Sequence, residues 1–262
     1  MPSSRYYRFK TISKEEKIKK IKILFFLFFL LSIILTVLWL IFLSSFLKIQ
    51  NINISDNTVL NRDDILNIIA NSAPFGLGEN LLILSKSRLK SGLAAVFPSI
   101  TDITIKKKLF HTVIVGFYKR IQIGIWCGNM GCYYFDKTGV AFAKTPETEG
   151  SLILKIEDLS KNDILLGDKV LDNNLINFII AFNAKISENN KFKILEFKIK
   201  PSYSVDLEAV TDKNWSIYLD EKQDPAAAVN NLLSILEEAV KNTGSLEYVD
   251  LRIPSRVFYK LK

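Results

Sequence analysis

The sequence predicts an α+β protein with a single transmembrane helix, a β-α-α-β-β domain and a second mixed domain whose large sheet is mainly antiparallel. Three observations support this prediction. Residues 23 to 43 form an apolar run, strand-like alternation recurs after it, and stretches with helical spacing separate those strands. The residues beyond the run are enough for one large domain or two small ones, and we favour two.

The apolar run, Ile23 to Leu43, predicts a membrane anchor. A helix of this length would measure roughly 32 Å, close to the roughly 30 Å hydrocarbon core of a bilayer. The alternative is a cleaved signal peptide, whose apolar region is usually about 7 to 15 residues long and ends in a small-residue cleavage site. Ser44 and Ser45 do not supply such a site, so we expect one uncleaved span.

The charges on either side of the run predict its orientation. Residues 1 to 22 contain eight Lys and Arg residues, whereas the twenty residues after the span contain only Lys48 and Arg62. Because basic flanks stay in the cytoplasm, residues 1–22 should form a cytoplasmic tail of a type II cytoplasmic-membrane protein whose later domains lie outside. After Glu15 and Glu16 are counted, the tail carries six of the eight net positive charges. The basic balance therefore indicates topology and attraction to membrane lipid, not a nucleic-acid partner.

The first domain, expected over residues 44–120, shows two helices between strands. Asn61 is suited to cap the first helix, and the Pro- and Gly-containing residues 74–78 should end it. The expected elements are a strand over 49–54, helices over 61–69 and 85–97, and strands over 103–105 and 113–117.

The second domain, expected over residues 121–262, contains more strands. Asp136 and Gly139 bracket a short turn between aromatic-rich strands, and Asp224 caps a helix whose first turn holds Pro225. The other expected elements are a helix over 173–186, strands over 152–156, 194–199, 205–207 and 215–219, and final strands over 246–253 and 256–261.

Two motifs resemble the FtsQ/DivIB family of cell-division proteins. The stretch Tyr118 to Trp126, followed by Tyr133 to Phe142, is similar to the run from the last strand of that family's POTRA (polypeptide-transport-associated) domain into an ID-x-x-G-x-x-F hairpin. Tyr248 to Arg252 resembles the family's DLR strand. With the anchor and the β-α-α-β-β order, these matches cover most of the chain. Phe110 and Lys119 stand where the family commonly has Pro and Glu, so no role of that Glu is carried over.

The resemblance implies a non-enzymatic scaffold at the division septum, which links early and late divisome proteins and helps control septal wall synthesis. It implies FtsB-like and FtsL-like bitopic partners, and other divisome proteins besides. A late strand with unpaired main-chain groups can accept a partner's strand. The contact residues carried over by motif position are Arg252, Ile253, Ser255, Arg256 and Phe258.

Simpler interpretations of these residues stay open. Arg252 could simply pair with Asp250 or a neighbouring acidic residue, while Ile253 and Phe258 could belong to the core. A different class of function is also open, because POTRA domains occur in outer-membrane assembly factors and secretion pores as well. Such an adaptor would handle extended polypeptides at the edge of the first sheet.

Cys127 and Cys132 are separated by four residues in what should be a hairpin turn. Residues opposed across such a turn can meet the Cα separation of about 4.4 to 6.8 Å that a disulfide requires, and disulfides persist outside the cytoplasm. A structural disulfide is our prediction. Free thiols, a metal site and a thiol oxidoreductase remain the alternatives.

The sequence does not predict an enzyme. His111 is the chain's single histidine and is expected in a turn, whereas nucleophilic and zinc chemistry usually recruits histidine. No phosphate-binding loop, dinucleotide fingerprint or metalloprotease motif is present. We therefore expect no cofactor, no metal and no small-molecule substrate.

Overall fold

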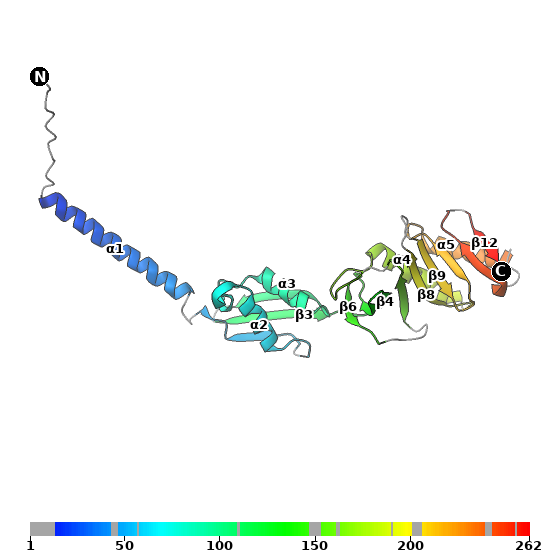
Figure 1. Cartoon of the computed structure of the whole chain (residues 1–262), viewed down its shortest axis with the longest axis horizontal. Coiled ribbons are helices and arrows are strands. Elements are labelled where there is room, and N and C mark those ends of the chain that lie inside the picture. The colour runs from blue at the N-terminus through cyan, green and yellow to red at the C-terminus, as the bar shows by residue number, and fades with distance from the viewer. Residues whose placement is uncertain are drawn as a thin grey trace, which may run out of the picture. The chain divides into compact units, whose positions relative to one another are not determined.

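The structure, a computed structural model, describes residues 14–42, 47–56, 58–108, 111–146, 153–160, 163–189, 191–200, 206–238, 243–254 and 256–262 (Figure 1). The chain divides into two compact units. The first comprises Met1–Lys90 with Thr104–Gly116, and the second comprises Ser91–Ile103 with Phe117–Lys262. The division passes through one helix and one hairpin, so the predicted boundary after residue 120 stays a prediction. Residues 1–13 of the predicted tail, Leu43 of the predicted span, and Ser255 lie outside the described residues.

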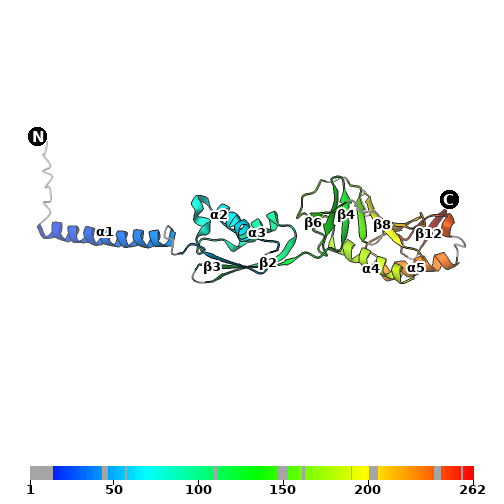
Figure 2. The same cartoon turned by 90° about the horizontal axis from the view of Figure 1, so that it is seen from below.

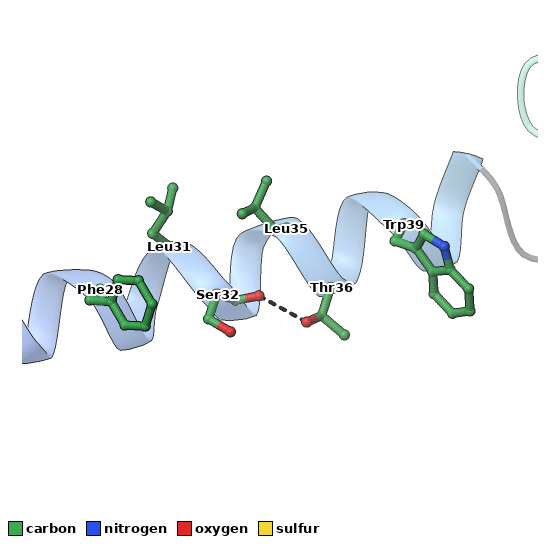
Figure 3. A pocket seen from close by; sticks show the side chains of 6 residues that line it. All are labelled: Phe28, Leu31, Ser32, Leu35, Thr36 and Trp39. Carbon is green, nitrogen blue, oxygen red and sulfur yellow. Dashed lines mark hydrogen bonds between the residues drawn. The ribbon is translucent and has the colours of Figure 1, made fainter.

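The N-terminal helix α1 (Lys14–Phe42) contains the predicted membrane span. Residues Lys17–Leu40 are long and apolar enough to cross a bilayer, and none of that segment is buried in the protein. The helix starts before residue 23, because Lys and Glu side chains are good helix formers and continue the helix into the basic segment. The Thr36 hydroxyl donates to the Ser32 carbonyl over 2.8 Å, which satisfies this polar group within the apolar run (Figure 3).

A three-stranded sheet with its helices follows α1, and its β-α-α-β-β order confirms the prediction. The strand order is β1-β3-β2, with β1 parallel to β3. Helix α2 starts after Asn61, whose N–H donates to Asp64 over 3.2 Å, and it buries Ile65 and Ile69. The elements are β1 (Asn51–Ile54), α2 (Arg62–Asn71), the 3-10 helix η2 (Pro74–Glu79), α3 (Lys86–Val96), β2 (Ile100–Lys108) and β3 (Thr112–Lys119).

The second unit is built on a nine-stranded sheet with the order β12-β11-β10-β9-β8-β7-β4-β5-β6. Five of its eight pairings are antiparallel and three are parallel, which confirms the prediction of a large, mainly antiparallel sheet. Its strands are β4 (Gly124–Gly128), β5 (Gly131–Phe135), β6 (Ala141–Lys144), β7 (Leu154–Asp158), β8 (Ile194–Lys200), β9 (Asp206–Thr211), β10 (Ser216–Leu219), β11 (Leu246–Asp250) and β12 (Phe258–Leu261).

Helices α4 (Asn173–Asn189) and α5 (Pro225–Glu238) lie side by side on one face of this sheet (Figure 2). Asp224 accepts a hydrogen bond of 2.8 Å from the N–H of Ala227, so it caps α5 as predicted. The apolar residues of both helices and alternate residues of the strands form one core, in which Trp126 and Trp215 are almost fully buried. The other face of the sheet carries the polar residues of the same strands.

Candidate functional site

The C-terminal strand β12 is the most exposed strand that the structure describes. All four of its side chains are exposed, including Phe258 at 49% and Leu261 at 50%. It pairs with β11 on one side, and no described strand lies on its other side. A partner's strand could therefore pair with this edge.

The direction of the backbone identifies which groups of β12 face the open side. Along an antiparallel strand, successive residues direct their N–H and C=O groups alternately to the two sides. Lys262 donates its N–H to the Ser245 carbonyl over 2.8 Å, toward β11. By this alternation, Lys260 and Phe258 also face β11. Tyr259 and Leu261 direct their backbone groups to the open edge.

The two faces of the β12 edge differ. Phe258 is paired with Asp250 and Lys260 with Tyr248, so these residues share the polar face of the sheet. Tyr259 is paired with Val249, a core residue, and therefore lies on the face that the helices cover. An added strand would meet exposed aromatic side chains on both faces.

The structure places the predicted contact residues around this edge. Ile253 is 50% exposed and Phe258 is 49% exposed, so the interpretation that they belong to the core is wrong. Arg256 is exposed as well, and its N–H donates to the Ile253 carbonyl over 3.2 Å. Arg252 forms a bidentate ion pair with Asp250, with Nη2 to Oδ2 at 2.7 Å and Nε to Oδ1 at 3.0 Å. The simpler interpretation of Arg252 as a partner of Asp250 therefore holds in the unbound chain.

A shallow hollow of about 320 Å³ lies beside the edge on the polar face. The Tyr218 and Tyr248 rings lie 5.4 Å apart between centroids, and two cations lie near the Tyr218 ring. Lys200 Nζ is 5.1 Å and the Arg252 guanidinium carbon 5.3 Å from the centroid of that ring. The lining residues are Lys200, Tyr218, Tyr248, Asp250 and Arg252.

Carboxylates hold these cations in place. Burial alone would raise the pKa of Asp250, but the hydrogen bonds and charge of Arg252 outweigh burial and lower that pKa. Burial would likewise raise the pKa of Glu208, whose bonds from Lys200 and Ser216 lower it instead. Both carboxylates are ionised at neutral pH, so the hollow suits recognition by charge and aromatic contact and is poorly suited to proton transfer.

Sequence reasoning missed Lys200, Tyr218 and Tyr248 as part of this site. The parallel pairing of β10 with β11 sets Tyr218 opposite Asp250 and brings the two tyrosines together. Tyr218 lies between two core residues and Tyr248 precedes one, which is a signal for a strand that faces solvent on one side. No local signal shows that these two strands are neighbours, because α5 separates them in the sequence.

The turn between β5 and β6 is held by Asp136. Its Oδ1 accepts bonds from the Thr138 N–H at 2.9 Å and the Val140 N–H at 3.1 Å. Its Oδ2 accepts a bond from the Arg120 guanidinium, which also donates to the Pro98 carbonyl. Gly139 completes the turn with a φ of +79°, and a Cβ there would lie 2.1 Å from the Leu171 carbonyl oxygen. The Asp136-x-x-Gly139 sequence thus encodes one turn, which Arg120 ties to the segment after β3.

Cys127 and Cys132 oppose each other directly across the β4–β5 hairpin, with 4.1 Å between their Cα atoms, and are joined by a disulfide. In the chain-entropy account, a bond that closes so short a loop stabilises the fold by about 2 kcal/mol. We expect the C127S/C132S double variant to lose about this much free energy of unfolding, measured by denaturant titration. A reductant should lower the stability of the unmodified protein equally and leave the double variant unchanged. A stability unaffected by both treatments would mean that the cysteines are not bonded in solution.

Metal-ligating side chains do not gather anywhere in the part of the chain that the structure describes. Among the described residues, no group of three or more His, Cys, Asp or Glu side chains could hold an ion. The His111 ring nitrogen Nδ1 lies 2.9 Å from the Lys48 carbonyl oxygen, so this histidine fastens a turn of the first unit.

Comparison with known families identifies the second unit. A family described as "Cell division protein FtsQ/DivIB, C-terminal" matches residues 124–252, from the start of β4 to just beyond β11. A search of curated proteins found no match. The matched family is a non-catalytic family of division proteins. The family match and the apolar helix α1 together fit a single-pass membrane protein. The chain belongs to the FtsQ/DivIB family of cell-division proteins.

Proposed function

We propose that this protein is a non-enzymatic scaffold that links early and late divisome proteins at the septum and helps to control septal wall synthesis. Its specific activity is to capture FtsB-like and FtsL-like bitopic partners by strand addition to β12. The exposed open edge of β12 is the observation that carries the proposal. In the proposed topology, the basic tail lies in the cytoplasm and both folded units lie outside.

The chemistry of the edge supports strand addition. The main-chain groups of Tyr259 and Leu261 supply hydrogen bonds that are independent of the partner's sequence, whereas neighbouring side chains select it. Phe258 and Ile253 offer apolar contact, since each is about half exposed. The hollow at Tyr218 offers an aromatic face and two cations to a side chain from the partner.

Membrane anchoring strengthens such an interaction. A bitopic partner in the same bilayer meets this edge at a raised effective concentration, so a modest pairwise affinity suffices. The scaffold acts by position, because it holds partner chains together without any bond being made or broken.

Photo-crosslinking in cells tests the proposal. We place a photoreactive residue at Ile253 or Arg256 beside the edge, and matched probes at Asn53 of β1 and Thr104 of β2, which are exposed on the first sheet. Small bitopic proteins should be captured from the first pair and identified by mass spectrometry. Capture of varied unfolded or secreted chains, chiefly from the second pair, would instead indicate an adaptor for polypeptide transport.

A further inference from the structure

The first sheet is held close to the end of α1. Five residues lead from Phe42, the last residue of α1, to Leu47, and such a segment spans no more than roughly 18 Å. The Leu47 carbonyl accepts a hydrogen bond of 2.8 Å from the N–H of Leu81. The loop around Leu81 therefore stays within a short reach of the bilayer surface, wherever the rest of the chain lies.

The end of the β2–β3 hairpin meets the same segment. Gln50 and Asn51 both donate their N–H groups to the His111 carbonyl over 3.0 Å, and the His111 ring contacts the Lys48 carbonyl. Because β1 runs parallel to β3 from Asn51 opposite Thr112, the last residues of β2 lie at the end of the sheet nearest to α1 along the chain.

Basic side chains concentrate at this end. Lys107 Nζ donates to the Leu82 carbonyl over 3.3 Å. Burial, and then the nearby charge of Lys86, lower the pKa of Lys107, which places a second cation beside it. Lys106 and Lys108, which flank Lys107 in β2, have exposed side chains. The Leu82 side chain is 60% exposed. We call Leu82, Lys86, Lys106, Lys107 and Lys108 the basic tip.

Acidic neighbours do not neutralise the basic tip. Within the part of the chain that the structure describes, none of its four lysines forms an ion pair, although Lys48 pairs with Glu79 over 3.5 Å. Lysines on an edge strand also prevent aggregation. That role accounts for the lysines of β2, but it accounts neither for Lys86 on α3 nor for the exposed Leu82.

We propose that the basic tip docks on the anionic lipid headgroups of the membrane that α1 crosses, with Leu82 entering the interface. The short tether keeps the tip within reach of the headgroups, which extend about 5 to 7 Å beyond the hydrocarbon core on each side. Four lysines are attracted to an anionic surface within a Debye length of about 10 Å. Docking at a second point besides α1 restricts how the first unit can tilt relative to the bilayer.

The test uses the full-length protein in nanodiscs. The Leu82→Cys variant is labelled with an environment-sensitive maleimide under non-reducing conditions, which leave the Cys127–Cys132 disulfide closed. One set of discs contains neutral phosphatidylcholine and the other is rich in phosphatidylglycerol. Quenching of the label by nitroxide lipids should be stronger in the anionic discs. It should fall as ionic strength rises from 0.1 to 1 M, because the Debye length shrinks from about 10 to about 3 Å.

Charge variants decide the source of the effect. Changing all four tip lysines to Gln should reduce the ratio of docked to undocked protein on the order of 1,000-fold, whereas changing them to Arg should preserve docking. The matched control removes four lysines from the second unit: Lys137, Lys213, Lys222 and Lys262. Equal quenching in both lipids, or an equal loss in the control variant, would overturn the proposal. Unchanged far-UV circular dichroism of the Gln variant, together with unchanged amide hydrogen exchange in β1 and β3, excludes unfolding of the first unit as the cause of a loss.

Discussion

Replacing Tyr259 with proline is expected to weaken partner capture on the order of 100-fold while leaving the nine-stranded sheet folded. The N–H of Tyr259 faces the open edge, so proline removes no hydrogen bond to β11 but does remove one that an added strand would need. The proline ring also obstructs the approach of that strand. Crosslinking yield from a photoreactive residue at Ile253 measures the loss.

Two further variants separate the backbone from the side chain. Tyr259→Ala removes the tyrosine ring, as Tyr259→Pro does, but it keeps the backbone N–H. It should therefore retain most of the partner capture. Lys260→Pro removes an N–H that faces β11, so it should lower the stability of the C-terminal strand pair itself. If Tyr259→Pro and Tyr259→Ala behaved alike, side-chain contact would explain the binding and strand addition would be rejected.

The Asp136→Ala variant is expected to lose about 3 kcal/mol of unfolding free energy, the largest effect on stability that we foresee. The Asp136 and Arg120 side chains are only 6% and 15% exposed, so the substitution leaves a guanidinium buried without its carboxylate. The turn also loses the acceptor for the Thr138 and Val140 N–H groups. Trp126 and Trp215 are buried in the same unit, so denaturant titration followed by tryptophan fluorescence reports the loss.

Acid should reduce this contribution. Burial alone would raise the pKa of Asp136, but the bonds from Thr138, Arg120 and Val140 together lower it. A carboxylate whose pKa is lower in the folded state stabilises fully above its unfolded value, near 3.9, and loses that effect as pH falls through the folded value. The stability difference between the unmodified protein and Asp136→Asn should therefore shrink below about pH 4.

An exposed carboxylate provides the control for the Asp136 variants. Asp163 is exposed and accepts one long hydrogen bond, of 3.4 Å, from Asn129. Asp163→Ala should change stability by less than about 0.5 kcal/mol. A loss as large as that of Asp136→Ala would show that net charge, not the turn, controls stability.

Local chemistry in the sequence predicted the elements well. The Ile23 to Leu43 run marked α1, and Asp224 with Pro225 marked the start of α5, because a cap and an apolar stripe are properties of one continuous segment. The C-terminal edge could be predicted too. The sequence predicts a last strand after the DLR motif, and the structure places that strand, β12, at the edge of the sheet. Phe258 lies outside the core because β12 is the edge strand of the sheet. The order of the strands decides this, and no local sequence pattern contains that order.

The arrangement of the sheet could not be read from the sequence. Strand β7 lies between β4 and β8, and both pairings are parallel, whereas the strand ranges predicted from the sequence carry no information on strand order. The sequence places Arg120 at the end of the first domain and in the Tyr118 to Trp126 motif, but it does not show that Asp136, sixteen residues later, is its partner. These contacts join segments that are apart in the sequence, so local propensity does not predict them.

The three parallel pairings of the second sheet have a consequence for how the protein matures. Each closes a long excursion of the chain: Gly124 meets Leu154, Ile156 meets Phe197, and Ser216 meets Tyr248. Sheets made of such distant contacts fold slowly, on the order of milliseconds to seconds. Strand β12 is joined to the sheet through β11, and β11 through its closure with β10. Under the proposed function, a chain would therefore gain the open β12 edge only after β11 has closed onto β10, so incompletely folded copies would not capture a partner's strand.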